Sequence, residues 1–479
     1  MINREQPAGM NLKRIYTVFL AAYAVLAVLL YFLMGYQLHF RESQGNLAMP
    51  PAEAGTVELV QGTVVEQTFS VKIQRLREVN VRWGTYYRPN SGTVTMELLR
   101  ANDGVLILSR TFDVAAITEG GLTEMTAEEP IEGLYGVPLL LRISADSVSG
   151  AAASPMMSFS GGSGLTLNGQ NVEGRLCFSV TGEDYIWTGL HYWKFVIALG
   201  TLLALCLIYS DLRWKKGRPS GVVTALLALQ KYRFLIRQLV DRDFKSKYKR
   251  SILGVFWSFL NPLLNMLVQY LVFSKMFRFD IPNFPVYLLC GNVVFNYFSE
   301  ACGMSLTSIV GNAGLITKVY MPKYIYPLTR IISSMINLLI SLIPLFAVAL
   351  ISGVLPTKAY LLLPIPLVCL AMFCLGLGML LATAMVFFRD VQFLWGVLTT
   401  IWMYMTPIFY PMSALPEAVQ TVVKWNPLYY FVTFVRTCVI EGVSPEPKMY
   451  AQCALISFVM LLVGVLAFKK NQDKFVLYL

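Results

Sequence analysis

Apolar residues gather in about eight long runs along the chain. Each run approaches the roughly 20 residues that a helix needs to cross the hydrocarbon core of a bilayer. The pattern therefore predicts a polytopic α-helical membrane protein with about eight transmembrane helices. The predicted spans cover residues 15–36, 192–210, 252–276, 284–308, 328–352, 360–386, 391–411 and 451–468.

A long region of soluble composition separates the first two apolar runs. Apolar and polar residues alternate there with the period of two that a half-buried β-strand shows. Asn102-Asp103-Gly104 predicts a hairpin turn, and residues 148–164, rich in Ser, Gly and Ala, predict a loop. We expect an inserted β-sandwich-like domain with short strands. The strand candidates are 67–73, 79–83, 93–98, 139–143 and 175–180.

These patterns divide the chain into four parts. They are an N-terminal tail with the first transmembrane helix (1–39), a β-rich domain (40–187), a second transmembrane helix with a linker (188–219) and a membrane unit with six transmembrane helices (220–479). The membrane unit opens with residues 222–250, in which apolar residues recur near helical spacing with basic residues among them. That pattern predicts a helix in the membrane interface. Taken alone, this helix fits an anchor and a force-transmitting element equally well.

The charge distribution orients the predicted spans. The chain is 56% hydrophobic and 14% charged, with a net charge of +11. Lys and Arg mark the cytoplasmic side of membrane proteins, and here they cluster at alternate ends of the spans. We therefore expect both termini in the cytoplasm and residues 40–187 outside. The basic excess fits membrane orientation rather than nucleic-acid binding, because no basic stripe is interleaved with a soluble binding fold.

The sequence offers little for catalysis or metal binding. Of eight cysteines only Cys177 lies in the outer region, so no internal disulfide is expected there. Two histidines and no CxxC pair disfavour zinc. Asp241-Arg242-Asp243 imitates a metal motif of sugar transferases, but no nucleotide-binding domain surrounds it. No GxxxxGK[ST] phosphate loop occurs either, so any ATP hydrolysis must come from another polypeptide.

Four segments, in order, resemble permease subunits of ABC-2 type polysaccharide exporters, the family that moves O-antigen, capsule and teichoic acid precursors. Residues 242–262 resemble the family's opening signature, and 312–328 resemble its cytoplasmic loop between the second and third spans. Residues 387–392 with 404–411 resemble the segment around its fifth span, and 426–436 its outer re-entrant hairpin. The resemblance covers 220–479. The first two spans and the β domain depart from the family's usual pattern.

The resemblance implies a transporter permease subunit rather than an enzyme, placed in the bacterial cytoplasmic membrane. Its substrate would be a lipid-linked polysaccharide or a teichoic-acid-like polymer. It also implies a homodimer that works with two copies of a separate ATPase, which would bind ATP and Mg. The residues expected to couple the permease to that ATPase are Arg242, Asp243, Lys245, Lys247, Asn312, Leu315, Lys318, Pro322, Lys323, Arg389 and Asp390.

Aromatic residues suggest where a glycan would pass, because ring faces pack against the CH-rich faces of sugars. The alternative for each is an interfacial aromatic belt. The expected path residues are Trp257, Phe295, Tyr297, Trp402, Tyr404, Phe409, Tyr410, Tyr429, Tyr430, Phe434 and Arg436. In the β domain, Trp83, Tyr86 and Tyr87 are candidates for glycan contact, with ordinary half-buried strand residues as the alternative.

Two other functions fit the same residues. A non-transporting envelope scaffold or glycan sensor would bind through the outer β domain and use the spans as an anchor. A passive channel would conduct its substrate without an active ATPase.

Overall fold

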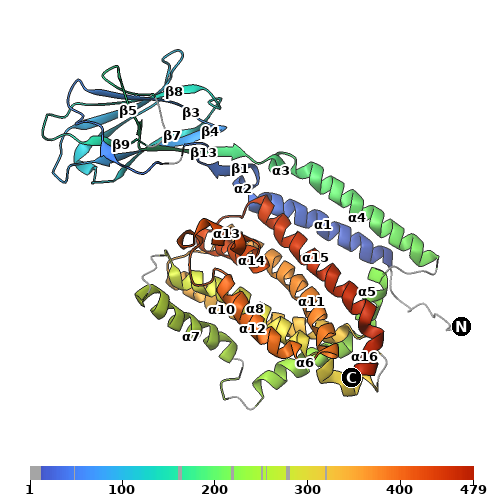
Figure 1. The fold of residues 1–479 in the computed structure, drawn as a ribbon. Coiled ribbons are helices and arrows are strands. Elements are labelled where there is room, and N and C mark those ends of the chain that lie inside the picture. Colours follow the sequence, from blue (N-terminus) through green and yellow to red (C-terminus); the bar gives the residue numbers. More distant parts are fainter. Residues whose placement is uncertain are drawn as a thin grey trace. The chain divides into compact units, whose positions relative to one another are not determined.

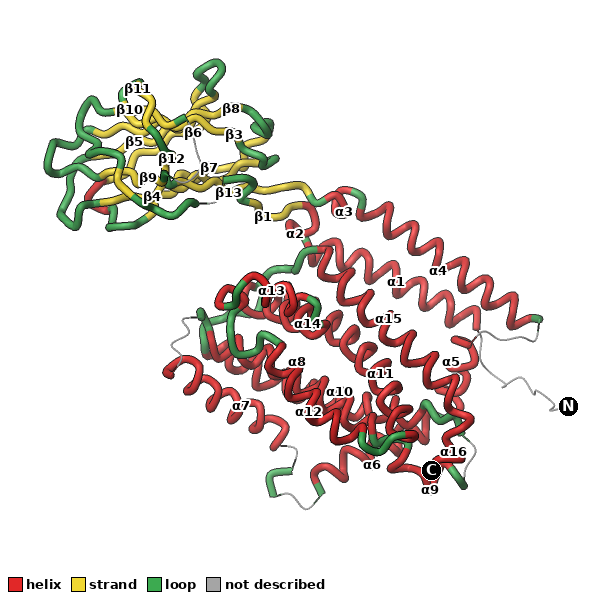
Figure 2. Tube along the Cα trace, in the orientation of Figure 1, coloured by secondary structure: helices red, strands yellow, loops and turns green. Residues whose placement is uncertain are grey.

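The computed structural model describes residues 12–47, 49–159, 164–216, 221–249, 252–254, 256–276, 281–318 and 321–479. The chain divides into two compact units (Figures 1 and 2). One is helical and consists of Met1–Leu38 with Tyr192–Leu479, and the other is the β unit His39–His191. The predicted fold class, a helical membrane protein with an inserted β-rich domain, is confirmed.

The β unit contains two antiparallel sheets that enclose one apolar core. The seven-stranded sheet has the order β1-β13-β4-β9-β12, with β7 also paired to β4 and β2 to β9. Its strands are β1 (Phe40–Ser43), β2 (Ala54–Gly55), β4 (Arg75–Gly84), β7 (Leu122–Glu132), β9 (Ser154–Ser158), β12 (Arg175–Leu176) and β13 (Phe178–Tyr185). The six-stranded sheet, in order, is β11 (Gln170–Val172), β10 (Leu165–Leu167), β3 (Val64–Ser70), β8 (Pro138–Ala145), β5 (Thr93–Arg100) and β6 (Leu106–Asp113).

The alternation in the sequence accounts for most of these strands. In β8, Leu139, Leu141 and Ile143 point into the core, as the period of two requires. The hairpin predicted at Asn102-Asp103-Gly104 is confirmed, because it joins β5 to β6 and Gly104 takes a φ of +68°. The loop predicted for 148–164 is wrong in part. Residues 154–158 form β9, whose small side chains and methionines show no alternation because nearly all of them are buried.

The helical unit contains long helices at all eight predicted spans. Its longer helices are α1 (Leu12–Met34), α4 (Tyr192–Lys215), α5 (Gly221–Lys231), α6 (Arg233–Tyr248), α7 (Phe256–Tyr270), α8 (Phe284–Leu306), α10 (Ile325–Ile351), α11 (Pro364–Phe387), α12 (Val391–Met405) and α15 (Pro447–Asn471). The shorter ones are α9 (Ala313–Ile316), α13 (Glu417–Lys424), α14 (Pro427–Arg436) and α16 (Phe475–Tyr478).

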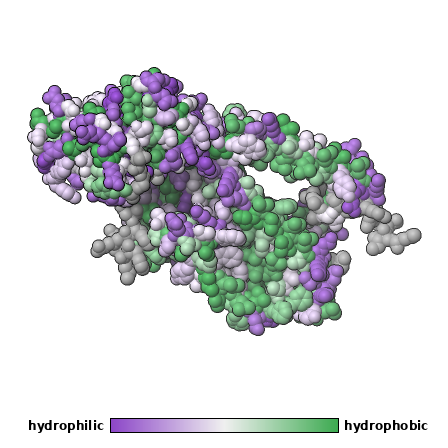
Figure 3. All heavy atoms as spheres, turned by 45° about the horizontal axis from the view of Figure 1, so that its top comes forward, coloured by the Kyte–Doolittle hydropathy of each residue, from purple (hydrophilic) through white to green (hydrophobic). Residues whose placement is uncertain are grey.

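Within the described ranges, six helical segments are long and apolar enough to cross a membrane. Eight spans are therefore not confirmed. The two predicted spans outside this set are α12, which has only 15 residues, and α8, which carries polar residues such as Asn292, Asn296 and Glu300 along its length. Figure 3 shows an extensive apolar surface over the visible face of the helical unit and a mainly polar one over the β unit.

The core of the helical unit surrounds α8. This helix packs against α10, α11 and α7, and most of its side chains are buried. Helices α11 and α15 lie side by side (Figure 1) and approach closely at two glycines. A Cβ atom added at Gly464 would lie 2.0 Å from the carbonyl oxygen of Gly376, so only glycine fits there. This contact holds α15 against the core.

We predict that Gly464→Ala destabilises the helical unit, because the added methyl group forces the two backbones apart. Overpacking of this kind costs about 1–3 kcal/mol. The matched control is Gly396→Ala in α12, where an added Cβ meets nothing within 4 Å and alanine favours the helix. Thermal unfolding of the detergent-solubilised protein should show a lower midpoint for G464A and an unchanged or higher one for G396A. Equal midpoints would contradict the packing argument.

Candidate functional site

The predicted interfacial helix 222–250 is two helices rather than one. Helices α5 and α6 meet at Tyr232, and Arg250 lies outside the described residues. Helix α6 buries Leu239, Val240 and Asp243. It packs against α10 rather than lying only on the surface of the unit. Buried positions on an otherwise basic helix show that α6 is fixed to the bundle by one face.

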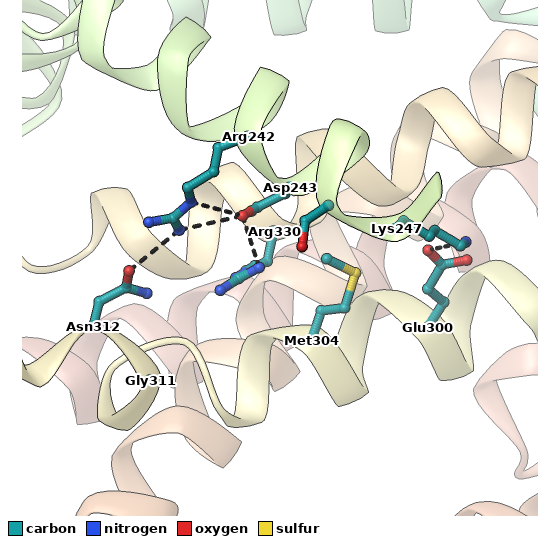
Figure 4. A pocket seen from close by; sticks show the side chains of 9 residues that line it. Arg242, Asp243, Lys247, Glu300, Met304, Gly311, Asn312 and Arg330 are labelled. Carbon is teal, nitrogen blue, oxygen red and sulfur yellow. Dashed lines mark hydrogen bonds and ion pairs between the residues drawn. The ribbon is translucent and has the colours of Figure 1, made fainter. Parts of the chain in front are cut away.

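The carboxylate of Asp243 is the centre of this attachment. Its side chain is 3% exposed, and its Oδ1 accepts from Arg330 of α10 at 2.9 Å and from Arg242 at 3.2 Å. A buried carboxylate requires such partners, because an unpaired charge in an apolar interior is strongly unfavourable. Figure 4 shows Arg242 and Asp243 projecting from α6 toward Arg330 and Asn312. The ion pair therefore joins α6 to α10.

Asn312 extends the cluster to the connection between α8 and α10. Arg242 donates to Asn312 Oδ1 at 3.2 Å, and Asn312 Nδ2 donates to the carbonyl oxygen of Ser308 at 2.7 Å. Asn312 comes directly before α9, the short helix at the start of the predicted coupling loop. The structure thus brings three of the predicted coupling residues, Arg242, Asp243 and Asn312, into one hydrogen-bonded group.

A second ion pair lies one turn further along α6. Lys247 contacts Glu300 of α8 at 2.8 Å, and Asn337 of α10 donates to the same carboxylate oxygen at 2.6 Å. The hydroxyl of Tyr248 donates to Asn337 Oδ1 at 3.0 Å. The two pairs connect α6 to α10 and α8, so a displacement of α6 must break them or move those helices with it.

The two ion pairs line one open pocket of about 740 Å³. Its charged lining residues are three cations and two carboxylates: Arg242, Lys247, Arg330, Asp243 and Glu300. The five charges nearly balance and are largely paired with one another. Within the described residues, no group of three or more His, Cys, Asp or Glu side chains could hold a metal ion.

Helix α10 begins within the segment 312–328, at Ile325 rather than at the predicted residue 328. Pro327 lies in the first turn of α10, where a missing backbone N–H leaves no hydrogen bond unmade, so it does not interrupt the helix. Leu315 and Lys318 are exposed on α9 and just after it. Lys323 instead donates to the carbonyl oxygen of Gln472 and lies over the ring of Phe475. It ties the loop to the C-terminal segment.

The remaining predicted coupling residues lie apart from the pocket. Arg389 and Asp390 are exposed in the turn between α11 and α12. Lys245 is exposed on α6, and Pro322 is half-buried before α10. These four positions contribute to the surface of the helical unit rather than to the pocket.

The predicted aromatic path is not assembled into one surface. Trp257 and Tyr404 are exposed, and Trp402, Tyr410, Tyr429 and Tyr430 are half-buried. Four of the predicted path residues have side chains in the core, so no face of their rings is open to a substrate in this structure. These residues are Phe295, Tyr297, Phe409 and Phe434.

Arg436, another of the predicted path residues, is buried and bonds to backbone carbonyl oxygens. Its guanidinium donates to the carbonyl oxygens of Tyr287, Pro407 and Ile408 at 2.6–3.3 Å and lies over the ring of Tyr287. Pro407 and Ile408 follow the end of α12, where the helix has stopped and its carbonyl groups need donors. Arg436 therefore holds broken backbone against the start of α8.

In the β unit, Trp83 offers no ring face to a glycan in this structure. Its ring is fully buried, and its Nε1 donates to Thr123 at 2.8 Å. Tyr87, by contrast, is 90% exposed. Tyr86 and Tyr87 both take a positive φ, a conformation that strains non-glycine residues.

Glu119 holds this strained turn. Its Oε2 accepts from the backbone N–H and the hydroxyl of Thr85 and from the backbone N–H of Tyr87. The hydrogen bond from the Thr85 backbone N–H, followed by that from the Thr85 hydroxyl, lowers the pKa of Glu119. Because this pKa is lowered, the ionised Glu119 carboxylate stabilises the folded turn at pH values above the ordinary carboxyl pKa. The stabilisation is lost as the pH falls through the lowered pKa.

Arg330 and Asn337 are residues of the candidate site that the sequence analysis missed. Arg330 is a charge inside an apolar run, five positions after the start of α10. An ionisable residue within a spanning helix is a functional candidate by default, so this signal was present in the sequence. Asn337 carries no such mark, because a single amide in a helix gives no indication of its partner.

By class, the helical unit is a membrane permease. The ABC-2 type transporter family matches residues 235–440. The O-antigen export system permease protein RfbA of Myxococcus xanthus is 31% identical over 249 residues, which are 52% of this chain and 96% of that protein. The polysialic acid transport protein KpsM of Escherichia coli is 22% identical over 50% of this chain and 93% of its own length. The chain therefore belongs to the ABC-2 type transporter family.

We predict that Arg330→Met destabilises the helical unit by about 3–5 kcal/mol, because it leaves the buried Asp243 with one partner. Arg242→Met should cost less than about 1 kcal/mol, since the Arg242 side chain is 49% exposed. The double variant Arg330→Met with Asp243→Leu should recover most of the loss. Unfolding midpoints of the solubilised protein measure all three. Equal losses for R330M and R242M would contradict a buried ion pair at the centre of the site.

Proposed function

We propose that this protein is the membrane subunit of an ATP-driven exporter of a lipid-linked polysaccharide or teichoic-acid-like polymer. The observation that carries the proposal is the attachment of α6 to α8 and α10 through Asp243 and Lys247. Membership of the ABC-2 type transporter family and relatives named as O-antigen and polysialic acid export proteins support it.

The energy source in this proposal is a separate ATPase subunit, two copies of which work with a homodimer of this chain. The ATPase subunit would bind ATP and Mg, because this sequence lacks a phosphate loop. Leu315 and Lys318 offer an exposed apolar and an exposed basic side chain on α9 and beside it. A partner that binds Leu315 and Lys318 and then moves would shift the start of α10. Through the contact between Asn312 and Arg242 it would also shift α6.

The proposal places the complex in the bacterial cytoplasmic membrane, with both termini in the cytoplasm and residues 40–187 outside. The candidate spans and the positions of Lys and Arg at their ends support this orientation. The β unit would then meet the polymer as it emerges. Its strained and exposed Tyr86-Tyr87 turn supports a contact with the glycan there.

The direct test is to delete the chain from its native cell and measure glycan at the surface. Loss of the polymer from the surface, restored by the wild-type chain together with an active ATPase partner, is the expected result. Undisturbed display after deletion would overturn the exporter. Restoration by a chain paired with a hydrolysis-dead ATPase would point to a passive channel instead.

We predict that Leu315→Asp together with Lys318→Glu abolishes surface display while the protein still folds, because both side chains are exposed and contribute little to the core. The matched control is Lys358→Glu, an exposed lysine in the 3-10 helix Lys358–Leu362 that follows α10. Co-purification with the ATPase should fall at least tenfold for the double variant and stay unchanged for K358E. Normal surface display by the double variant would show that α9 is not part of the surface that contacts the ATPase.

We predict that Tyr87→Ala weakens retention of the emerging glycan, because it removes a ring that is 90% exposed. The control is Tyr135→Ala, which removes another exposed tyrosine of the β unit. The amount of glycan that co-purifies with the full chain measures the effect. Equal co-purification with both variants would argue against a sugar contact at the Tyr86-Tyr87 turn.

A further inference from the structure

A second pocket, of about 390 Å³, lies between α7, α8 and α10. It shares Lys247 and Glu300 with the first pocket and continues from them along the spanning helices. Amide and hydroxyl side chains form most of the remaining lining: Ser258, Asn261, Asn265, Asn296, Asn337 and Ser341. We call these six residues the amide track. None of them was among the predicted path residues.

The spacing of these residues explains why they form one surface. On α7, Ser258, Asn261 and Asn265 follow at intervals of three and four residues, which places them on one face of a helix. On α8, Asn292, Asn296 and Glu300 follow at intervals of four. Asn292 donates to Gln269 of α7 at 2.5 Å, and this contact joins the two polar faces beyond the pocket.

Exposed amides on these helices make a lipid-facing position energetically unfavourable. Asn296 is exposed although its neighbours on α8 are almost all buried, and Asn261 and Asn265 are exposed on α7. Moving an amide into an apolar medium without a hydrogen-bond partner costs roughly 2–7 kcal/mol. Among the described residues, the track amides of α7 bond to each other once, where Asn265 donates to Asn261 Oδ1 at 3.0 Å. Each amide has two donor hydrogens and two acceptor lone pairs, so much of this capacity is left for water or a ligand.

We propose that the amide track binds the polysaccharide during its passage through the membrane unit. This inference rests on the proposed function and names the surface that the polymer touches. Neutral amides donate to and accept from sugar hydroxyls, and no charge along the track would hold one sugar unit tightly. Trp257, which is 44% exposed, adds a ring face at the same pocket. The pocket volume lies within the range of small-ligand sites.

The ion pair between Lys247 and Glu300 forms the wall that the two pockets share. Lys247 and Tyr248 both reach this wall from α6, and α6 is the helix tied to the coupling cluster through Asp243. If this end of α6 moves while α8 and α10 stay in place, Lys247 separates from Glu300 and Tyr248 separates from Asn337. The track then opens toward the larger pocket, which links the partner's movement to entry of the polymer.

A second copy of this chain is the competing occupant of the track. The cores of homodimer interfaces are more apolar than the rest of a protein surface, whereas this pocket is concave and lined mainly by amides, hydroxyls and charges. A polar ligand in water fits that lining better. The oxidation experiment described below tests whether a second copy occupies the track.

Thiol labelling tests the track without relying on transport. Asn265→Cys, Asn296→Cys and the control Leu267→Cys, which removes an exposed apolar residue of the same helix α7, are reacted with a charged, membrane-impermeant thiosulfonate in the full chain in liposomes. Wild-type labelling gives the background of the native cysteines. We expect N265C and N296C to react at least tenfold faster than L267C. Equal rates overturn the proposal.

Oxidation of the same variants tests for a second copy. A disulfide between two copies of N265C requires Cα atoms within about 7 Å of each other, which leaves no room for a polymer between them. Such a covalent dimer would overturn the proposal, and its absence together with fast labelling would support it.

Surface display then separates the track from the exporter function. Asn265→Leu with Asn296→Leu should lower display at least tenfold while the ATPase partner still co-purifies. The matched control is Gln452→Leu on α15, a half-buried amide outside the lining of both pockets, which should display normally. If the deletion strain loses the polymer but the double variant displays it normally, the exporter stands and the track is refuted. If the deletion strain displays normally, the exporter itself fails.

Discussion

The buried carboxylate of Asp243 constrains the rest of the helical unit. A charge that is 3% exposed must stay paired, so α6 keeps its contact with Arg330 of α10. That contact fixes the position of Lys247 and Tyr248, which in turn reach Glu300 and Asn337. One electrostatic requirement thus places a basic, partly exposed helix against α8 and α10 and aligns its far end with a polar pocket.

The same principle explains the polar residues deeper in the unit. Polar groups within an apolar medium need partners, and the structure provides two solutions. Arg436 is satisfied entirely by backbone carbonyl oxygens and holds broken backbone in place. The exposed amides of Asn261, Asn265 and Asn296 keep spare hydrogen-bonding capacity. The first solution gives rigidity, and the second gives a surface for a hydroxyl-rich polymer in the proposed exporter.

The sequence predicted where the helices and strands lie better than it predicted which of their side chains are buried. Long apolar runs located the helices, and Asn102-Asp103-Gly104 located a hairpin, because these signals are local. The burial of Trp83 and Phe434 was not predicted, because aromatic composition does not distinguish a core from a path. The partner of Asp243 depends on tertiary packing. The four-residue spacing of Asn292, Asn296 and Glu300 was visible in the sequence, but only the structure shows that it faces a matching stripe on α7.

The central claim is that the C-terminal end of α6, which carries Lys247, moves against α10 when the proposed ATPase partner binds nucleotide, while Asp243 and Arg330 stay paired. Spin labels at Lys245 of α6 and Leu339 of α10, both exposed, report this distance in the full complex, with Val368 of α11 and Leu455 of α15 as the control pair. We expect a non-hydrolysable ATP analogue to change the first distance by about 1–2 Å or more and to leave the second unchanged. An unchanged distance between the labels at 245 and 339, in a complex that hydrolyses ATP, would contradict this account.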